Sequence, residues 1–306
     1  MRKQIGMILG ALLLTLAVFT GCGSSASETS SAVATSSSSS QQIAIKMLNV
    51  GQGDAILIQT AEQTVLIDTS DLDEQDKLRQ ELKKAGITKI DKLILTHPHA
   101  DHIGGVAGVV LKDYPVSEVY DDGMMSKSKV YINYMKMLKQ KNIPRKGLVA
   151  GDVLDFGSGV TFKVLAPTAE LVAKANDKNY KHDPNNESVI GQLIFGDFKM
   201  MFTGDAEKVE EQTVLAASTN LKSQVLKAGH HGSKTSSSKE FLQAVKPETA
   251  LISCGAGNDY GHPHAETMKK FRALNLKIFE TDKNGTITVT SDGKTYKVTT
   301  EQGGAQ

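Results

Sequence analysis

Four side chains that can bind a metal ion occur within six residues, in the segment His97-Pro98-His99-Ala100-Asp101-His102. An apolar run at residues 92–95 comes directly before this segment, and Ile103-Gly104-Gly105 follows it. The run predicts a buried strand and the glycines predict a turn, so the segment lies where a strand ends. Imidazole nitrogen and carboxylate oxygen suit zinc and neighbouring first-row metals. The pattern therefore predicts a metal centre with the ligands His97, His99, Asp101 and His102.

A bridging carboxylate is also needed if two metal ions lie about 3.5–4 Å apart, because such a pair draws further ligands from distant segments. Asp205 is the candidate for this bridge, since it follows a predicted strand at residues 199–202. The alternative is a structural role, in which Asp205 caps a helix that begins at Ala206.

Histidines follow two more predicted strands. His230 and His231 come after the strand at residues 225–227, and His262 comes after the strand that ends near Cys254. A histidine in these places can complete a ligand set, donate a proton or hold an anionic substrate. The residues by themselves leave open which histidine has which role.

The order of β-prone and helical segments predicts the fold class. Three short β-prone runs between residues 43 and 67 predict consecutive antiparallel strands, and the spacing of Leu78 and Leu82 predicts a helix that ends at Gly86. Later segments repeat this mixture, with a helix near residues 129–141, strands at residues 160–165, 189–195 and 199–202, and a helix at residues 206–217. We expect an α/β fold of four layers, an α/β/β/α sandwich, over residues 42–300, with a short tail at 301–306 and the site at the strand ends.

The N-terminal residues resemble an export signal. Arg2 and Lys3 precede an uncharged stretch whose apolar centre, at residues 8–19, is too short to span a bilayer comfortably. Small residues precede Cys22, which therefore resembles the lipid-modified first residue of a bacterial lipoprotein; an ordinary signal peptide with an incidental cysteine is the alternative. We expect a signal peptide at 1–21, a Ser-rich flexible tether at 22–41, and an exported protein that faces the extracytoplasmic side of the cell membrane.

Replacing Cys22 with Ala should release the protein from membranes, because the predicted lipid would be its anchor. The measurement is the fraction that sediments with membranes after a high-salt wash. A variant that stays bound would contradict the lipoprotein interpretation.

Charge is unevenly distributed although the formal net charge is only +1, which argues against a protein that coats nucleic acid generally. Residues 123–151 contain no acidic side chain, and their basic ones are Lys127, Lys129, Lys136, Lys139, Lys141, Arg145 and Lys146. A solvated helix face and a rim that attracts phosphate both explain this segment.

Several motifs together resemble the metallo-β-lactamase domain of the ComEC family of DNA-uptake competence proteins. They lie at residues 49–54, 66–68, 96–105, 185–188, 203–205, 230–233 and 260–263, within a match that extends from about residue 43 to 298. The resemblance implies two divalent ions, zinc or manganese, bound by His97, His99, Asp101 and His102 and bridged by Asp205.

The same resemblance bears on the remaining site residues. In related choline-phosphate esterases the second histidine of such a pair binds metal and the first contacts phosphate, which implies His231 as a ligand and His230 as a catalytic substrate contact; the reverse assignment stays open. Asn185, Ser188 and His262 are expected to contact the substrate. Many other enzymes of this fold have a third histidine about where Asn185 and Ser188 lie here.

The expected function is metal-dependent cleavage of phosphodiesters, with extracellular DNA as the substrate and Asp101 orienting the nucleophile. One alternative is a hydrolase of choline phosphate, cell-wall polymer, a lactone or a β-lactam. Another is a lipoprotein that captures DNA without cutting it. The absence of Trp weakens a base-stacking platform. No obligate protein partner is evident from the sequence.

Overall fold

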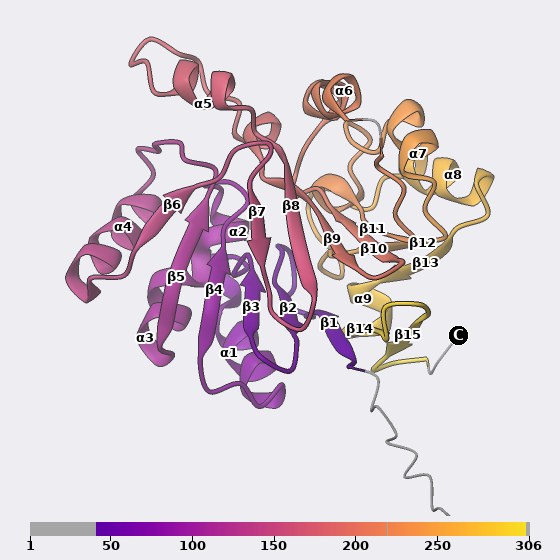
Figure 1. Cartoon of the computed structure of the whole chain (residues 1–306), viewed down its shortest axis with the longest axis horizontal. Helices are drawn as coiled ribbons and strands as arrows, with labels where there is room; N and C mark the ends of the chain where they lie inside the picture. The colour runs from indigo at the N-terminus through magenta and orange to yellow at the C-terminus, as the bar shows by residue number, and fades with distance from the viewer. Residues whose placement is uncertain (1–40, 219, 304–306) are drawn as a thin grey trace, which may run out of the picture. The chain divides into compact units, whose positions relative to one another are not determined.

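The computed structural model describes residues 41–218 and 220–303 (Figure 1). The predicted signal peptide, Cys22 and the predicted tether up to residue 40 lie outside the described residues. Among the residues described, no helix is both long and apolar enough to cross a bilayer.

The two ends of the described chain form one sheet of eight strands, in the order β15-β14-β1-β2-β3-β4-β5-β6. The antiparallel pairing of β1 with β2 and of β2 with β3 confirms the predicted first three strands. From β3 to β6 the neighbouring strands are parallel. The bounds are β1 Ile43–Met47, β2 Ile56–Gln59, β3 Thr64–Ile67, β4 Ile90–Ile94, β5 Val116–Asp121, β6 Arg145–Gly147, β14 Ile287–Ser291 and β15 Tyr296–Thr300.

The middle of the chain forms a second sheet of seven strands, in the order β13-β12-β11-β10-β9-β8-β7. Strands β10 to β13 are parallel to one another, and β7 to β10 are antiparallel. The bounds are β7 Val153–Asp155, β8 Val160–Ala166, β9 Ile190–Phe195, β10 Phe198–Phe202, β11 Val225–Lys227, β12 Thr249–Ile252 and β13 Lys277–Glu280.

Helices cover the outer face of each sheet (Figure 1). One apolar core, with Ile45, Phe162 and Phe202, fills the space between the sheets. A second core lies under α1, α2 and α4, and a third under α6, α7 and α8. These layers confirm the predicted α/β/β/α sandwich. The helices are α1 Gln75–Lys84, α2 Ala100–Gly105, α3 Leu111–Asp113, α4 Lys129–Lys141, α5 Ala169–Ala175, α6 Lys208–Ala217, α7 Lys239–Val245, α8 Ala265–Ala273 and α9 Thr281–Asn284.

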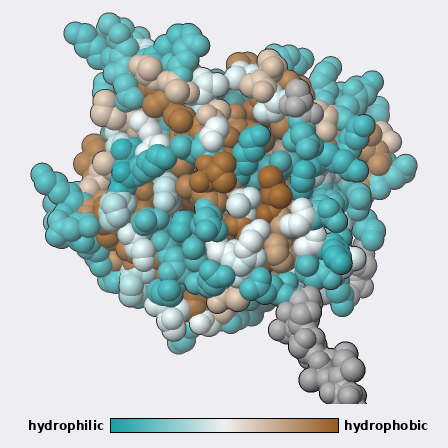
Figure 2. All heavy atoms as spheres, viewed as in Figure 1, coloured by the Kyte–Doolittle hydropathy of each residue, from teal (hydrophilic) through white to brown (hydrophobic). Residues whose placement is uncertain are grey.

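Helix α4 carries most of the basic segment and has the predicted bounds. The Ser128 hydroxyl caps its first turn, and Tyr131, Tyr134 and Leu138 pack into the core. The lysines of this helix are exposed, which agrees both with a solvated helix face and with a rim that attracts phosphate. Beyond the helix, acids from outside the segment reduce its positive charge, because Arg145 pairs with Asp121 and Lys146 with Asp152. Figure 2 shows one face of the molecule, most of which is covered by hydrophilic side chains, with hydrophobic side chains in small separate groups.

The two glycines after the metal-binding motif lie in helix α2, not in the predicted turn. A Cβ on Gly104 would come within 2.4 Å of the Leu72 backbone nitrogen, and one on Gly105 within 2.3 Å of the Thr69 oxygen. The glycines therefore allow α2 to pack directly on the chain that leaves β3, and this contact holds the motif in place.

Candidate metal centre

The predicted ligands come from strands of both sheets and meet at one edge. His97 follows β4 in the first sheet, while Asp205 follows β10 and His231 follows β11 in the second. The carboxyl ends of parallel strands lie on the same side of a sheet, and the packing of the two sheets brings both ends together. Side chains more than a hundred residues apart thus share one site.

Four of the predicted ligands form a compact group. Asp101, His102, Asp205 and His231 each offer a ligand atom, and these atoms lie within 4.8 Å of one another. His102 Nε2 is 3.2 Å from Asp205 Oδ1, and His231 Nε2 is 3.2 Å from Asp101 Oδ2 and 3.5 Å from Asp205 Oδ2.

Two atoms in this group, His102 Nε2 and Asp205 Oδ1, are buried and face each other at 3.2 Å without a hydrogen bond of good geometry. Buried polar atoms in proteins are nearly always hydrogen-bonded, so this facing nitrogen and carboxylate oxygen fit a shared cation. The donor set, two imidazoles and two carboxylates, also suits a first-row divalent ion.

His97 and His99 lie together beside this group. His97 Nε2 is 3.0 Å from His99 Nδ1, and the His97 ring is 4.1 Å from that of His102. His97 is fully buried and His99 is partly exposed. The two rings thus lie beside the compact group and outside it, and their roles as metal ligands stay predictions.

Neighbouring groups orient the imidazoles. The Asp68 carboxylate accepts hydrogen bonds from the backbone N–H and hydroxyl of Thr96 and lies 2.8 Å from His102 Nδ1. His231 Nδ1 lies 2.9 Å from the Ser253 carbonyl. Because the Asp68 and Ser253 oxygens accept hydrogen bonds, the Nδ1 atoms of His102 and His231 carry protons. The Nε2 atom of each ring then faces Asp205.

The charges of the group are strongly coupled. Burial alone would raise the pKa of Asp205, but the rings of His102 and His231 and the Lys227 ammonium hold it well below the usual range. Burial would lower the pKa of His102, but Asp205, Asp68 and Asp101 raise it well above normal. Protons on the imidazoles thus balance the carboxylates, and a bound cation would replace those protons.

A buried lysine completes the charge balance. Lys227 is 1% exposed, and its ammonium contacts the Asp54 carboxylate, donates to the Gly204 carbonyl at 2.8 Å and lies 3.7 Å from Asp205 Oδ1. Burial would lower the pKa of Lys227, but Asp54 and Asp205 raise it. It therefore stays charged and holds two carboxylates at the site.

His230 lies at the mouth of the group. Its Nδ1 is 3.1 Å from Glu207 Oε1 and 3.5 Å from Asn185 Nδ2, and its Nε2 is 3.8 Å from Asp205 Oδ2. His230 and His231 both have left-handed backbone, with φ of 48° and 52°. This strained turn points the two rings in different directions, with only His231 in the compact ligand group.

The other predicted substrate contacts differ in exposure. Ser188 is fully buried, and its hydroxyl accepts a hydrogen bond from the Asp205 backbone N–H at 3.2 Å, so it fixes the backbone at Asp205. The ring of His262 lies 5.5 Å from that of His230 and stacks on Tyr260, which is 66% exposed. Burial and the rings of His231, His230 and His264 lower the pKa of His262 to about 4, so it is neutral at pH 7.

Sequence reasoning assigned no role to Asp54, Asp68, Glu207 or Lys227. Asp54 and Asp68 lie within the motifs that carry the family resemblance, and this position could have marked them as site residues. The position of Lys227, a lysine in an apolar strand shortly before His230 and His231, was a weaker indication. Glu207, at the start of a predicted helix, had no signal that distinguishes it from an ordinary first-turn acid.

Comparisons with known proteins agree with this geometry. The family model described as "Metallo-beta-lactamase superfamily" matches residues 48–256. "ComE operon protein 3" of Bacillus subtilis is 34% identical over 79% of this chain and 32% of its own length. "Competence protein ComA" of Neisseria gonorrhoeae is 32% identical over 80% of this chain and 32% of its own length. The chain thus spans about a third of these curated relatives.

A solved structure also matches. The metallo-β-lactamase fold protein YhfI of Bacillus subtilis superimposes with a TM-score of 0.51 over 81% of this chain and 99% of its own, at 12% identity. At that identity the likeness concerns the fold alone.

Proposed function

Because this chain belongs to the metallo-β-lactamase superfamily, whose members are generally hydrolases, we propose that it is a metal-dependent phosphodiesterase that cleaves DNA outside the cell. The observation that carries the proposal is the group Asp101, His102, Asp205 and His231, with two buried atoms left for a cation. Anchoring by a lipid on Cys22, and zinc or manganese as the metal, belong to the same proposal.

The chain's own residues supply the remaining parts of the reaction. Bound divalent ions would lower the pKa of a water and neutralise charge that develops on the phosphoryl group. Asp101 is partly exposed beside His231, where its carboxylate can accept a hydrogen bond from the attacking water and orient it. His230, held through Nδ1 by Glu207, directs Nε2 toward the place of a substrate oxygen.

DNA is the favoured substrate because a relative that is 32% identical is named as a competence protein, and because the motifs of this chain resemble those of DNA-uptake competence proteins. Two features beside the site suit a nucleic-acid strand. Tyr260 offers an exposed aromatic face next to His262, which a base can stack on. Lys127 lines a pocket together with Pro98 of the metal-binding motif, where an ammonium group can meet a phosphate.

The function is tested by assaying the full chain with zinc or manganese on plasmid DNA, on bis(p-nitrophenyl) phosphate and on a β-lactam. We expect metal-dependent cleavage of the two phosphodiesters, and loss of activity in EDTA. Robust β-lactam turnover without phosphodiester cleavage would overturn the substrate class. DNA binding without cleavage of any ester would favour a capture protein.

Replacing Asp101 with Asn should lower kcat by about a hundredfold or more, equivalent to on the order of 3 kcal/mol of barrier. The amide keeps the shape but removes the charge that orients the nucleophile. Turnover should be measured at saturating metal, so that weaker metal binding is compensated. Asp73→Asn, on the surface before α1, is the matched control and should keep full activity. An unchanged kcat in the Asp101 variant would exclude the orienting role.

His230→Ala and His231→Ala should differ in metal content. His231 belongs to the ligand group, so its loss should cost bound metal, while loss of His230 should leave the metal in place and lower kcat/KM. Elemental analysis of both purified variants, beside their kinetics, measures this difference. Metal loss in the His230 variant alone would reverse the assignment.

A further inference from the structure

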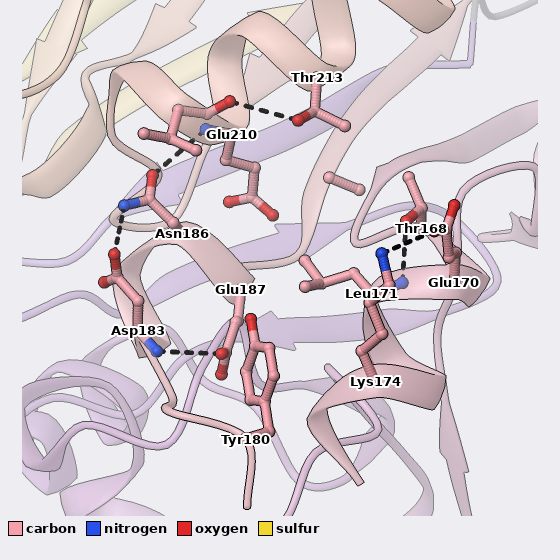
Figure 3. A pocket seen from close by; sticks show the side chains of 12 residues that line it. Thr168, Glu170, Leu171, Lys174, Tyr180, Asp183, Asn186, Glu187, Glu210 and Thr213 are labelled. Carbon is pink, nitrogen blue, oxygen red and sulfur yellow. Dashed lines mark hydrogen bonds and ion pairs between the residues drawn. The ribbon is translucent and has the colours of Figure 1, made fainter. Parts of the chain in front are cut away.

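A pocket of about 270 Å³ lies between α5, the short 3-10 helix Pro184–Glu187 and α6, outside the metal-ligand group (Figure 3). Its lining combines acidic, aromatic and aliphatic side chains, namely Asp183, Glu187, Glu210, Tyr180, Leu171 and Val209. Lys174 also lines it, but its ammonium pairs with Glu170 at 2.7 Å, and these two side chains are 63% and 77% exposed. The lining therefore carries an excess of negative charge.

Glu210 is the group that this environment leaves unsatisfied. It is only 3% exposed, and neither carboxylate oxygen has a hydrogen-bond partner of good geometry. Figure 3 shows its carboxylate pointing into the pocket, between Asn186 and Leu171. A buried carboxylate without a partner is costly, so it calls for a proton or a cation.

The neighbouring acids cannot provide that partner. Glu187 is already satisfied, since it accepts from the Asp183 N–H at 3.0 Å and lies 3.0 Å from His182 Nδ1. Asp122 is 2% exposed, and one of its own oxygens lacks a partner. Burial, together with the charges of Glu187, Asp122 and Asp183, raises the pKa of Glu210 well above the usual value, and the Ser188 N–H only partly opposes this.

We propose that this pocket binds a small organic ammonium ion, whose N–H groups pair with the Glu210 carboxylate and whose alkyl chain lies against Leu171 and Val209. Tyr180 adds an aromatic side chain of the kind that favours a cation. No three of the described acidic side chains of the pocket bring their ligand atoms within 4.8 Å of one another. A primary ammonium, which needs fewer converging oxygens than a bare metal ion, fits this arrangement better.

The test uses the metal-loaded full chain at pH 7.5 and constant ionic strength, with butylammonium chloride as the probe. Thermal unfolding and calorimetric titration are compared with NaCl, 1-butanol and CaCl₂. We expect butylammonium to raise Tm by about 3 °C or more at ten times its Kd, and NaCl and 1-butanol to leave it unchanged. Glu210→Gln should weaken binding tenfold or more, while Glu240→Gln, an exposed acid on α7, should bind as the native protein does.

Glu210→Gln should also unfold at or above the native Tm without the probe, because a neutral amide is cheaper to bury. Leu171→Trp fills the pocket from α5 without changing Glu210, and it should block binding as well. The proposal fails if butylammonium gives no shift, if 1-butanol gives the same shift, or if Glu210→Gln binds undiminished. If CaCl₂ raises Tm only when Glu210 is present, and butylammonium does not raise it, the pocket is a metal site instead.

Discussion

Asp205→Asn should lower turnover by about a thousandfold or more and reduce bound metal from about two ions per chain. In the native protein, Asp205 Oδ1 faces His102 Nε2 at 3.2 Å and Oδ2 faces His231 Nε2 at 3.5 Å, so one carboxylate serves both sides of the group. An amide has a single acceptor oxygen and no charge, and the proposed sites should therefore weaken together. Elemental analysis and metal titration, beside the phosphodiester assay, measure both effects.

Asp197→Asn is the matched control. Asp197 is exposed in the turn before β10, whereas Asp205 follows the other end of the same strand. The control should keep metal and activity, and circular dichroism should show that both variants fold. Unchanged stoichiometry and affinity in Asp205→Asn would remove Asp205 from the bridging role.

Lys227→Met should lower the free energy of unfolding by about 3–5 kcal/mol, the range seen when one partner of a buried ion pair is removed. The substitution fills a similar volume but leaves the Asp54 carboxylate without its cation, and Asp54 Oδ1 already lacks a hydrogen-bond partner. Urea unfolding should be measured with and without excess metal, because a bound cation near Asp205 offsets part of the lost charge.

Two further variants separate this effect from a general loss of a lysine. Lys139→Met, on the exposed face of α4, should change stability by less than about 0.5 kcal/mol. Asp54→Leu combined with Lys227→Met removes both charges and should recover part of the loss. If Lys227→Met lowers the free energy of unfolding by less than about 1 kcal/mol, the ion pair of Lys227 with Asp54 contributes little to stability.

Local patterns were sufficient for much of the fold. The helix at residues 129–141 has the predicted bounds, because its apolar residues recur at helical spacing and Ser128 caps it. Strands β5, β6 and β7 were not predicted. The first is only partly buried and the other two are three residues long, so none has the run of apolar side chains that marks a strand. Gly104 was assigned to a turn because its need for close packing depends on the distant Leu72.

The sequence by itself determined the chemistry of the candidate site: a set of imidazoles and carboxylates, each placed directly after a strand. This follows from residue type and short-range periodicity, which a single segment carries. The family resemblance favoured His231 over His230 as the ligand but left the reverse assignment open. The tertiary structure places only His231 in the compact group, and it buries Lys227 between Asp54 and Asp205. Those choices depend on how two sheets pack across more than a hundred residues of chain and on a left-handed turn at His230 and His231, and no local pattern encodes either.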